Sequence, residues 1–197
     1  HIGNALEVKD AIDVLAGRTQ GDLLEISLLL GSHMLLLAEK AKTLPEARAM
    51  LENALSSGAG LRKLAEMIAA QGGDPRVVED LSLLPQAEVK RVMRAETAGY
   101  LSAMDTTALG MAAQRMGAGR AKKLDMLDYS VGYVLHVRLG DEVTEDTPLA
   151  TLYARNEAEA EEAEKAIRKA LTIARKKPQT PKLWDAVVTA EGITYNR

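Results

Sequence analysis

The stretch Val131-Gly132-Tyr133-Val134-Leu135-His136-Val137 decides how the rest of the chain is interpreted. Its β-branched, aromatic and leucine side chains occupy every second position, which is the period of a strand with one buried face. Gly140-Asp141 then breaks the strand, because glycine tolerates positive φ and aspartate caps turns. A second strand is expected at 148–153. These two strands predict a β-rich module, whereas the first half of the chain has the pattern of helices.

Composition bounds the possible functions. The chain has 197 residues, is 47% hydrophobic and carries a net charge of −3, so it can form one or two domains and has no field suited to nucleic acid. It contains no cysteine, which excludes disulfides, thiolate nucleophiles and thiolate zinc sites and is compatible with a cytoplasmic protein. The apolar run 23–37 contains Glu25 and Gly31, so no membrane span is predicted. The chain opens at His1 without an initiator methionine, and we expect it to be a piece of a longer protein.

Helical patterns fill the first part of the chain. Asn4 with Glu7, and Thr43 with Glu46, have the spacing of N-terminal caps with their acidic partners. The helix expected at 22–40 is apolar nearly all round, which predicts that it is buried. We expect its histidine, His33, to be a hydrogen-bonded core residue rather than a ligand. The helices are expected at 5–15, 22–40, 43–58 and 61–72, with a short helical segment after Asp74-Pro75.

The second part alternates strands with helices. Strands are predicted at 89–93 and 100–104, followed by a helix at 107–116 capped by Asp105 or Thr106. Gly117-Ala118-Gly119-Arg120 follows that helix, so a glycine C-cap is favoured over a phosphate-binding loop, which would precede a helix. A Glu-rich solvated helix is expected at 157–171. We predict a closing strand at 183–188 with Trp184 as a core anchor, and a loose tail at 189–197.

Two acids, Glu7 and Asp10, lie near the start of the first predicted helix. Acids at this end of a helix are favoured by the helix dipole, and this is the simpler interpretation. The alternative is a cation site, in which one carboxylate and carbonyls of the preceding loop hold a hard, oxygen-preferring ion. The residues alone leave both interpretations open.

Five ordered motifs give the chain a family resemblance. They occur in the same order in bacterial pyrimidine-nucleoside phosphorylases and thymidine phosphorylases, which the chain therefore resembles over most of its length. The motifs are Gly3-Asn4-Ala5-Leu6-Glu7-Val8, Leu30-Gly31-Ser32-His33-Met34, Ala70-Gln71-Gly72-Gly73-Asp74-Pro75, Gly117-Ala118-Gly119-Arg120-Ala121 and Gly132-Tyr133-Val134-Leu135-His136.

The resemblance implies an activity and an architecture. Enzymes of this family convert a pyrimidine nucleoside and phosphate into the free base and a pentose 1-phosphate. The implied fold class is α+β: the helical portion of a larger α/β domain at 1–85, followed at 86–197 by a β-rich C-terminal module. That module is of the hammerhead, biotinyl/lipoyl-like kind and carries helices of its own.

The resemblance also sets expectations for sites and partners. The family's phosphate- and pyrimidine-binding loops lie earlier in its chain, so we expect no catalytic and no substrate-binding residue here, and no activity from this chain alone. No cofactor is required. A potassium-like monovalent cation is implied, with Asp10 and the backbone carbonyl of His1 as an incomplete set of ligands. The family forms homodimers mainly through a separate helical domain, which we expect to be missing from this chain. We therefore expect a monomer or weak dimer, with no nucleic acid or membrane as partner.

A non-catalytic role is the alternative. The order of a strand, Gly140-Asp141-Glu142-Val143 and a second strand is similar to half of a biotinyl or lipoyl domain, which would make the chain a binding or interaction module. A carrier domain presents a lysine at a hairpin tip after its second strand. Residues 153–157 occupy that region here and contain no lysine.

Overall fold

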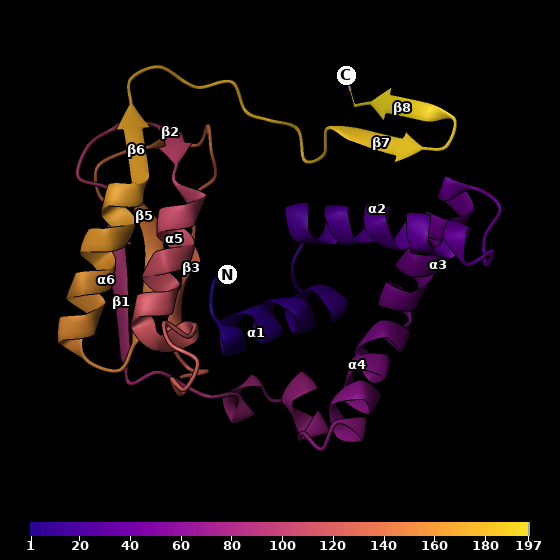
Figure 1. Cartoon of the computed structure of the whole chain (residues 1–197), viewed down its shortest axis with the longest axis horizontal. Coiled ribbons are helices and arrows are strands. Elements are labelled where there is room, and N and C mark those ends of the chain that lie inside the picture. Colours follow the sequence, from indigo (N-terminus) through magenta and orange to yellow (C-terminus); the bar gives the residue numbers. More distant parts are fainter. Residues whose placement is uncertain (197) are drawn as a thin grey trace. The chain divides into compact units, whose positions relative to one another are not determined.

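The structure, a computed structural model, describes residues 1–196, which divide into two compact units (Figure 1). Unit 1 comprises His1–Lys9 and Ser82–Thr180, and unit 2 comprises residues 10–81 and 181–196. Helix α1 (Asn4–Leu15) contributes residues to both. Helices are combined with small antiparallel sheets, so the predicted α+β class is confirmed. The domain boundary expected between residues 85 and 86 stays a prediction.

Unit 1 is built on two three-stranded antiparallel sheets. One has the strand order β1-β5-β3 and the other the order β4-β2-β6. The predicted strands at 89–93 and 100–104 both exist, but they belong to different sheets. The elements are β1 (Val89–Arg94), β2 (Gly99–Met104), α5 (Thr106–Ala113), η3 (Gln114–Ala118), β3 (Gly132–Leu135), β4 (Glu142–Val143), β5 (Pro148–Ala154), α6 (Glu157–Ala170) and β6 (Leu171–Ala174).

A single hydrophobic core holds unit 1 together. The alternation at 131–137 is confirmed in part: Val131, Tyr133 and Val137 are buried and Leu135 is partly buried, while the strand itself covers only Gly132–Leu135. β3 pairs with β5 in the register Tyr133↔Leu152, which places these two buried side chains beside each other in the sheet. Helices α5 and α6 lie together on one side of the strands and contribute Leu109 and Ile167 to the core (Figure 1).

Local sequence signals explain how these elements begin and end. Asp105 caps α5 as predicted, because its Oδ1 accepts a hydrogen bond from the amide of Ala108 at 2.9 Å. Asn156 caps α6 in the same way through the amide of Glu159. The predicted turn forms at Gly140, whose φ is +90°, and Asp141 Oδ2 accepts from the amide of Arg138 at 2.7 Å.

Unit 2 consists mainly of helices, and its caps follow the sequence. Thr43 Oγ1 accepts from the amide of Glu46, while the Glu46 carboxylate accepts from the amide of Lys42, which confirms the predicted capping pair. Helices α2 and α3 pack together, with Leu24 and Leu28 buried against Val14 of α1. The elements are α2 (Asp22–Leu37), α3 (Leu44–Ser56), α4 (Ala59–Ala70), η1 (Pro75–Val78), η2 (Leu81–Leu83, which straddles the unit boundary), β7 (Ala186–Thr189) and β8 (Gly192–Tyr195).

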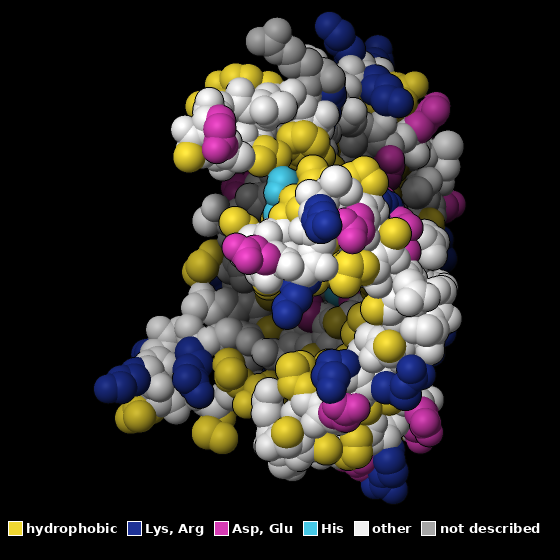
Figure 2. All heavy atoms as spheres, turned by 90° about the vertical axis from the view of Figure 1, so that its right-hand side faces the viewer, with side chains coloured by type: hydrophobic (Ala, Val, Ile, Leu, Met, Phe, Trp, Pro, Cys, Tyr) yellow, Lys and Arg dark blue, Asp and Glu magenta, His cyan; other side chains and the backbone are white. Residues whose placement is uncertain are grey.

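The predicted burial of α2 is wrong in part. Only Leu24, Leu28 and Ser32 of this helix are buried, and they form the face that packs within unit 2. The remaining apolar positions are partly or fully exposed, because the described chain provides a packing partner for one side of the helix only. Figure 2 looks at the molecule from the right-hand side of Figure 1 and shows hydrophobic side chains at the surface between charged ones.

Two further predictions for unit 2 are corrected. His33 is partly buried, but within the described residues its Nε2 has no hydrogen-bond partner, so it is not the satisfied core histidine that was expected. Trp184 lies outside the strand that forms at β7 and is only partly buried, so it is not a core anchor.

The segment expected to be a loose tail instead contains a strand. β8 pairs antiparallel with β7 in the register Val187↔Thr194, and the amide of Asn196 donates to the carbonyl of Asp185 at 2.8 Å. The sequence did not signal this hairpin because neither strand has a clear alternating pattern. Arg197, the last residue of the predicted tail, lies outside the described residues. Within residues 1–196, no helix is long and apolar enough to cross a membrane.

Candidate functional site

Three of the sequence motifs meet at one place in unit 1. Residues 2–4 lie beside the glycine-rich loop at 117–119 and beside the start of β3. Ile2 and Tyr133 form an antiparallel bridge in which each amide donates to the other residue's carbonyl at 2.9 Å. Segments more than 100 residues apart in the sequence are therefore joined by backbone hydrogen bonds. We call this place the motif junction.

Two glycines allow the motif junction to close. A Cβ atom on Gly132 would lie 2.2 Å from the carbonyl oxygen of Ile2, and one on Gly3 would lie 2.6 Å from the carbonyl oxygen of Val131. Both glycines also have positive φ, +148° and +138°. No other residue type fits this backbone conformation and this close approach without displacing the main chain. Close backbone contact thus explains why glycine is required at both Gly3 and Gly132.

The start of α1 is tied to the loop by Asn4. The side-chain amide of Asn4 donates to the carbonyl of Ala118 at 2.9 Å, so Asn4 is not the N-cap that its spacing predicted. Glu7 retains its part in the predicted pair, because its Oε1 accepts from the amide of Gly3 at 3.1 Å. The amide of Ala5 donates to the carbonyl of Tyr129, which adds a second contact between α1 and the chain before β3.

The glycine-rich loop ends a helix, as expected. Helix α5 continues into the π-helical turn η3, and Gly117 there has a φ of +104°, which breaks the helical conformation. The loop is closed by the amide of Asp128, which donates to the carbonyl of Gly117 at 3.0 Å. Asp128 Oδ1 in turn accepts from the hydroxyl of Ser130 at 2.6 Å. These bonds fix the path of the chain into β3.

A small cavity lies at the motif junction. Its volume is about 170 Å³, below the roughly 300 Å³ at which pockets for drug-sized ligands begin. The Glu7 carboxylate at its edge accepts a hydrogen bond from the amide of Gly3. The cavity is lined by Ile2, Gly3, Asn4, Glu7, Gly110, Ala113, Gln114, Ala118 and Gly119.

The motif at 132–136 carries two polar side chains, Tyr133 and His136, with defined hydrogen-bond partners. The buried hydroxyl of Tyr133 donates to the carbonyl of Leu109 at 2.7 Å, and burial raises the pKa of this tyrosine. His136 Nε2 lies 2.7 Å from Thr151 Oγ1. Desolvation, with a smaller contribution from Lys90, lowers the pKa of His136, which favours the neutral imidazole. The first contact joins β3 to α5, and the second joins the segment after β3 to β5.

The predicted cation ligands are both partly buried and make other interactions. His1 belongs to unit 1 and Asp10 to unit 2. One carboxylate and one carbonyl supply at most three oxygens, whereas a hard cation such as Ca²⁺ takes about six to eight, so these two residues do not complete a site. In the part of the chain that the structure describes, no three His, Asp or Glu side chains gather as metal ligands. The monovalent-cation site stays a prediction.

The region where a carrier domain would present its lysine has a different local structure. β5 ends at Ala154, and Asn156 immediately caps α6, so the chain enters a helix at this point. Arg155 forms an ion pair with Glu159 at 2.8 Å within the first turn. Tyr153 is covered on one side by the ammonium group of Lys90, 5.7 Å from the ring centre.

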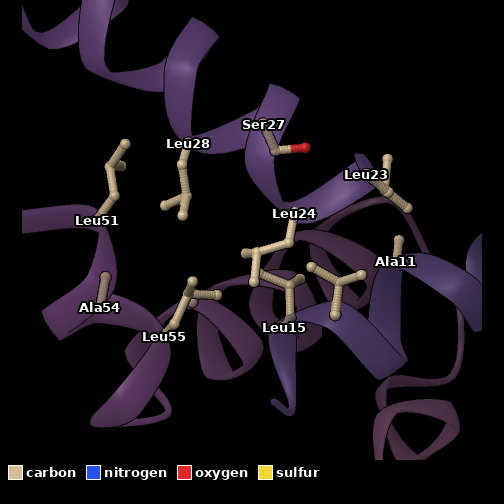
Figure 3. Close-up of a pocket in the computed structure, with 11 residues that line it drawn as sticks. Ala11, Leu15, Leu23, Leu24, Ser27, Leu28, Leu51, Ala54 and Leu55 are labelled. Carbon is tan, nitrogen blue, oxygen red and sulfur yellow. The ribbon is translucent and has the colours of Figure 1, made fainter. Parts of the chain in front are cut away.

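Unit 2 contains an apolar hollow of about 300 Å³, shown in Figure 3. Side chains of α1, α2 and α3 line it, and Leu24, Leu28 and Leu55 lie around it. Ser27 is the single hydroxyl side chain of the lining, so the hollow suits an apolar occupant. Its lining is Ala11, Val14, Leu15, Leu23, Leu24, Ser27, Leu28, Leu51, Ala54, Leu55 and Gly60.

The sequence identified the motifs but did not predict that three of them are in contact. The contact of Gly3 with Gly132 and the bond from Asn4 to Ala118 were both missed. A signal was present, since glycines recur in three motifs that have no phosphate-loop spacing. A glycine outside any such loop often marks close backbone approach. Which glycines approach each other depends on the topology, which one sequence does not reveal.

Comparison with known proteins relates this sequence to one family. Residues 100–174 match the family described as the pyrimidine nucleoside phosphorylase C-terminal domain. The pyrimidine-nucleoside phosphorylase of Geobacillus stearothermophilus is 49% identical over 156 residues, which cover 79% of this chain and 36% of that protein. The corresponding enzyme of Bacillus subtilis (strain 168) is 48% identical over 156 residues, with the same two shares. That of Staphylococcus aureus (strain USA300) is 42% identical over 173 residues, covering 88% of this chain and 40% of that protein.

The matches confirm the family resemblance, and the chain corresponds to the C-terminal portion of pyrimidine-nucleoside phosphorylases. The matched region spans less than half the length of each of these relatives.

Proposed function

We propose that these residues form the C-terminal scaffold of an enzyme that splits pyrimidine nucleosides with phosphate. The observation that carries the proposal is 49% identity to a pyrimidine-nucleoside phosphorylase over 79% of the chain. The motif junction supports it, because Gly3, Asn4 and Gly132 of the recognised motifs have steric and hydrogen-bonding roles in one contact.

The reaction requires groups that stabilise charge. Phosphate attacks the anomeric carbon while the bond to the base breaks, and the departing pyrimidine anion needs hydrogen-bond donors and cations around it. The cavity at the motif junction is smaller than a typical ligand pocket, and the hollow in unit 2 is almost entirely apolar. A larger cavity of about 580 Å³ in unit 1 has Arg115, Lys165 and Lys169 in its lining, but Lys165 is paired with Glu161. Because the match covers only 36% of the Geobacillus stearothermophilus enzyme and includes its C-terminal domain, we propose that the 197 residues alone are inactive and that phosphate and nucleoside bind to other parts of the enzyme.

The scaffold proposal assigns a role to each region. Unit 1, with its two three-stranded antiparallel sheets, supports the hammerhead-like description of the C-terminal module. The motif junction fixes the start of α1 to this module, so that the segment 2–9 has a defined path. We further propose that a monovalent cation, if held by Asp10 and the carbonyl of His1, takes its other ligands from outside these residues.

Release of thymine from thymidine tests the proposal. The purified chain at high concentration, with phosphate, is expected to release no base. Addition of a separately produced N-terminal portion of the Geobacillus stearothermophilus enzyme is expected to give phosphate-dependent release. Base release by the 197-residue chain alone would contradict the assignment of the reaction centre to other parts. Failure to release base from the mixture and from a covalent chimera of the two portions would contradict the scaffold role.

A further inference from the structure

Helix α2 has two apolar faces, and the described chain covers one of them. Leu24, Leu28 and Ser32 form the buried face, which packs on α1 and α3. At 3.6 residues per turn, spacings of seven, four and three residues place Leu23, Leu30, Met34 and Leu37 together on another face. These four side chains are exposed by 44%, 57%, 68% and 86%. We call them the outer stripe.

The outer stripe has the composition of a packing surface. Four large apolar side chains in line, without a charged residue among them, are unusual for a surface that faces water throughout. The charged residues of the helix lie elsewhere: Glu25, for example, is directed to Arg48 of α3 in an ion pair of 3.0 Å. A helix that is apolar on two opposite sides is typical of a position between two packing layers.

The apolar hollow continues the outer stripe. Leu23 is the first residue of the stripe and also lines the hollow of about 300 Å³, together with Leu15 and Leu55 (Figure 3). Apolar atoms around an open hollow lack van der Waals partners on one side, and an inserted apolar side chain restores those contacts. The stripe and the hollow therefore form one surface that can receive apolar side chains along α2 and at its start.

The comparisons indicate which partner fits this surface. The relatives contain 60% or more of their length outside the match. We propose that the outer stripe and the hollow are the docking surface for that remaining, N-terminal portion of a pyrimidine-nucleoside phosphorylase. This inference rests on the proposed function, and it names the surface through which the scaffold joins the part of the enzyme that binds substrate.

The test uses the same substitutions in two settings. In a chimera, this chain replaces the matched C-terminal portion of the Geobacillus stearothermophilus enzyme. Leu30→Ala and Met34→Ala are made separately in the chimera and in the 197-residue chain, and Tm is measured for each. If the stripe is covered in the chimera, each substitution removes buried apolar contacts and lowers Tm by roughly 5 °C. In the 197-residue chain, each is expected to change Tm by less than about 1 °C.

Met126→Ala is the matched control. Met126 is 90% exposed in unit 1, outside the stripe, so its substitution is expected to leave Tm unchanged in both settings. Equal losses for Met126→Ala and Met34→Ala in the chimera would overturn the proposal. So would a chimera whose Tm does not respond to the stripe substitutions, or a wild-type chimera that does not fold.

Two readouts separate this proposal from its alternatives. Light scattering of the 197-residue chain that showed a dimer, lost in Met34→Ala, would identify a second copy as the occupant and overturn the proposal. Thymine release by the chimera is measured independently. A folded chimera that responds to the stripe substitutions but releases no base would contradict the proposed function while supporting the docking surface.

Discussion

Leu152 in unit 1 and Leu37 in unit 2 are the same residue type in regular secondary structure, yet Leu152 is fully buried and Leu37 is 86% exposed. Leu152 lies on the central strand of a sheet that is covered by α6. Leu37 lies on a helix that packs through its other side. The unit 1 sheets therefore find their packing partners within the described chain, whereas α2 in unit 2 leaves large apolar side chains exposed.

The largest expected effect of a substitution lies in unit 1, at the motif junction. Gly132→Ala would place a Cβ 2.2 Å from the carbonyl oxygen of Ile2 and force a positive-φ residue into strain. We expect a loss of about 4 kcal/mol in the free energy of unfolding, measured in urea, because backbone has to move. Gly110→Ala is the control, since a Cβ there meets no atom within 4 Å and alanine favours the helix. A tolerated Gly132→Ala would show that the junction is not closed as described.

A substitution of one leucine in each unit compares the two regions directly. Leu152→Ala is expected to lower the free energy of unfolding by about 3 kcal/mol, because it opens a cavity in the unit 1 core. Leu37→Ala is expected to change it by less than about 0.5 kcal/mol in the 197-residue chain. Urea unfolding followed by circular dichroism measures both. Similar losses at the two positions would mean that Leu37 is covered and would remove the contrast between the units.

The smallest expected effect is a pH dependence that arises in unit 1. The folded-state pKa of His136 lies below its ordinary value of 6.5, so its contribution to stability is present above about pH 6.5 and is lost as pH falls toward the folded-state pKa. We expect His136→Gln to weaken the decline of Tm between pH 7 and pH 5. Lys90→Gln removes one of the causes and should raise the imidazole pKa in an NMR titration. An unchanged pH profile in His136→Gln would exclude this contribution.

The sequence predicted local structure better than it predicted which distant segments pair with each other. Asp105, the pair Thr43 and Glu46, and Gly140 were correctly assigned, because a cap or a turn depends on residues that are near in the chain. Strand β6 was missed, since it follows α6 without a loop and is defined by its pairing with β2. The paired residues, from Tyr100↔Ala174 to Met104↔Leu171, are far apart in the sequence and leave no local signal.

The sequence failed to predict parts of the candidate site for the same reason, because these depend on contacts between distant residues. The motif glycines were recognised, but the approach of Gly3 to Gly132 depends on the three-dimensional path of 129 residues. Burial of α2 was predicted from its composition, which indicates that apolar faces need cover and does not indicate whether the described chain supplies it. His33 was expected to be satisfied for the same reason, although its Nε2 has no partner among the described residues.

The bridge between Ile2 and Tyr133 also sets the order in which the chain can assemble. Ile2 leaves the ribosome long before its partner, and at roughly 5–20 residues per second the delay is on the order of ten seconds. β1 must likewise wait for β5, and β2 for β6. The helices of unit 2 emerge during this interval and can form at once from local contacts. The helices of unit 2 can therefore be complete before Ile2 can pair with Tyr133.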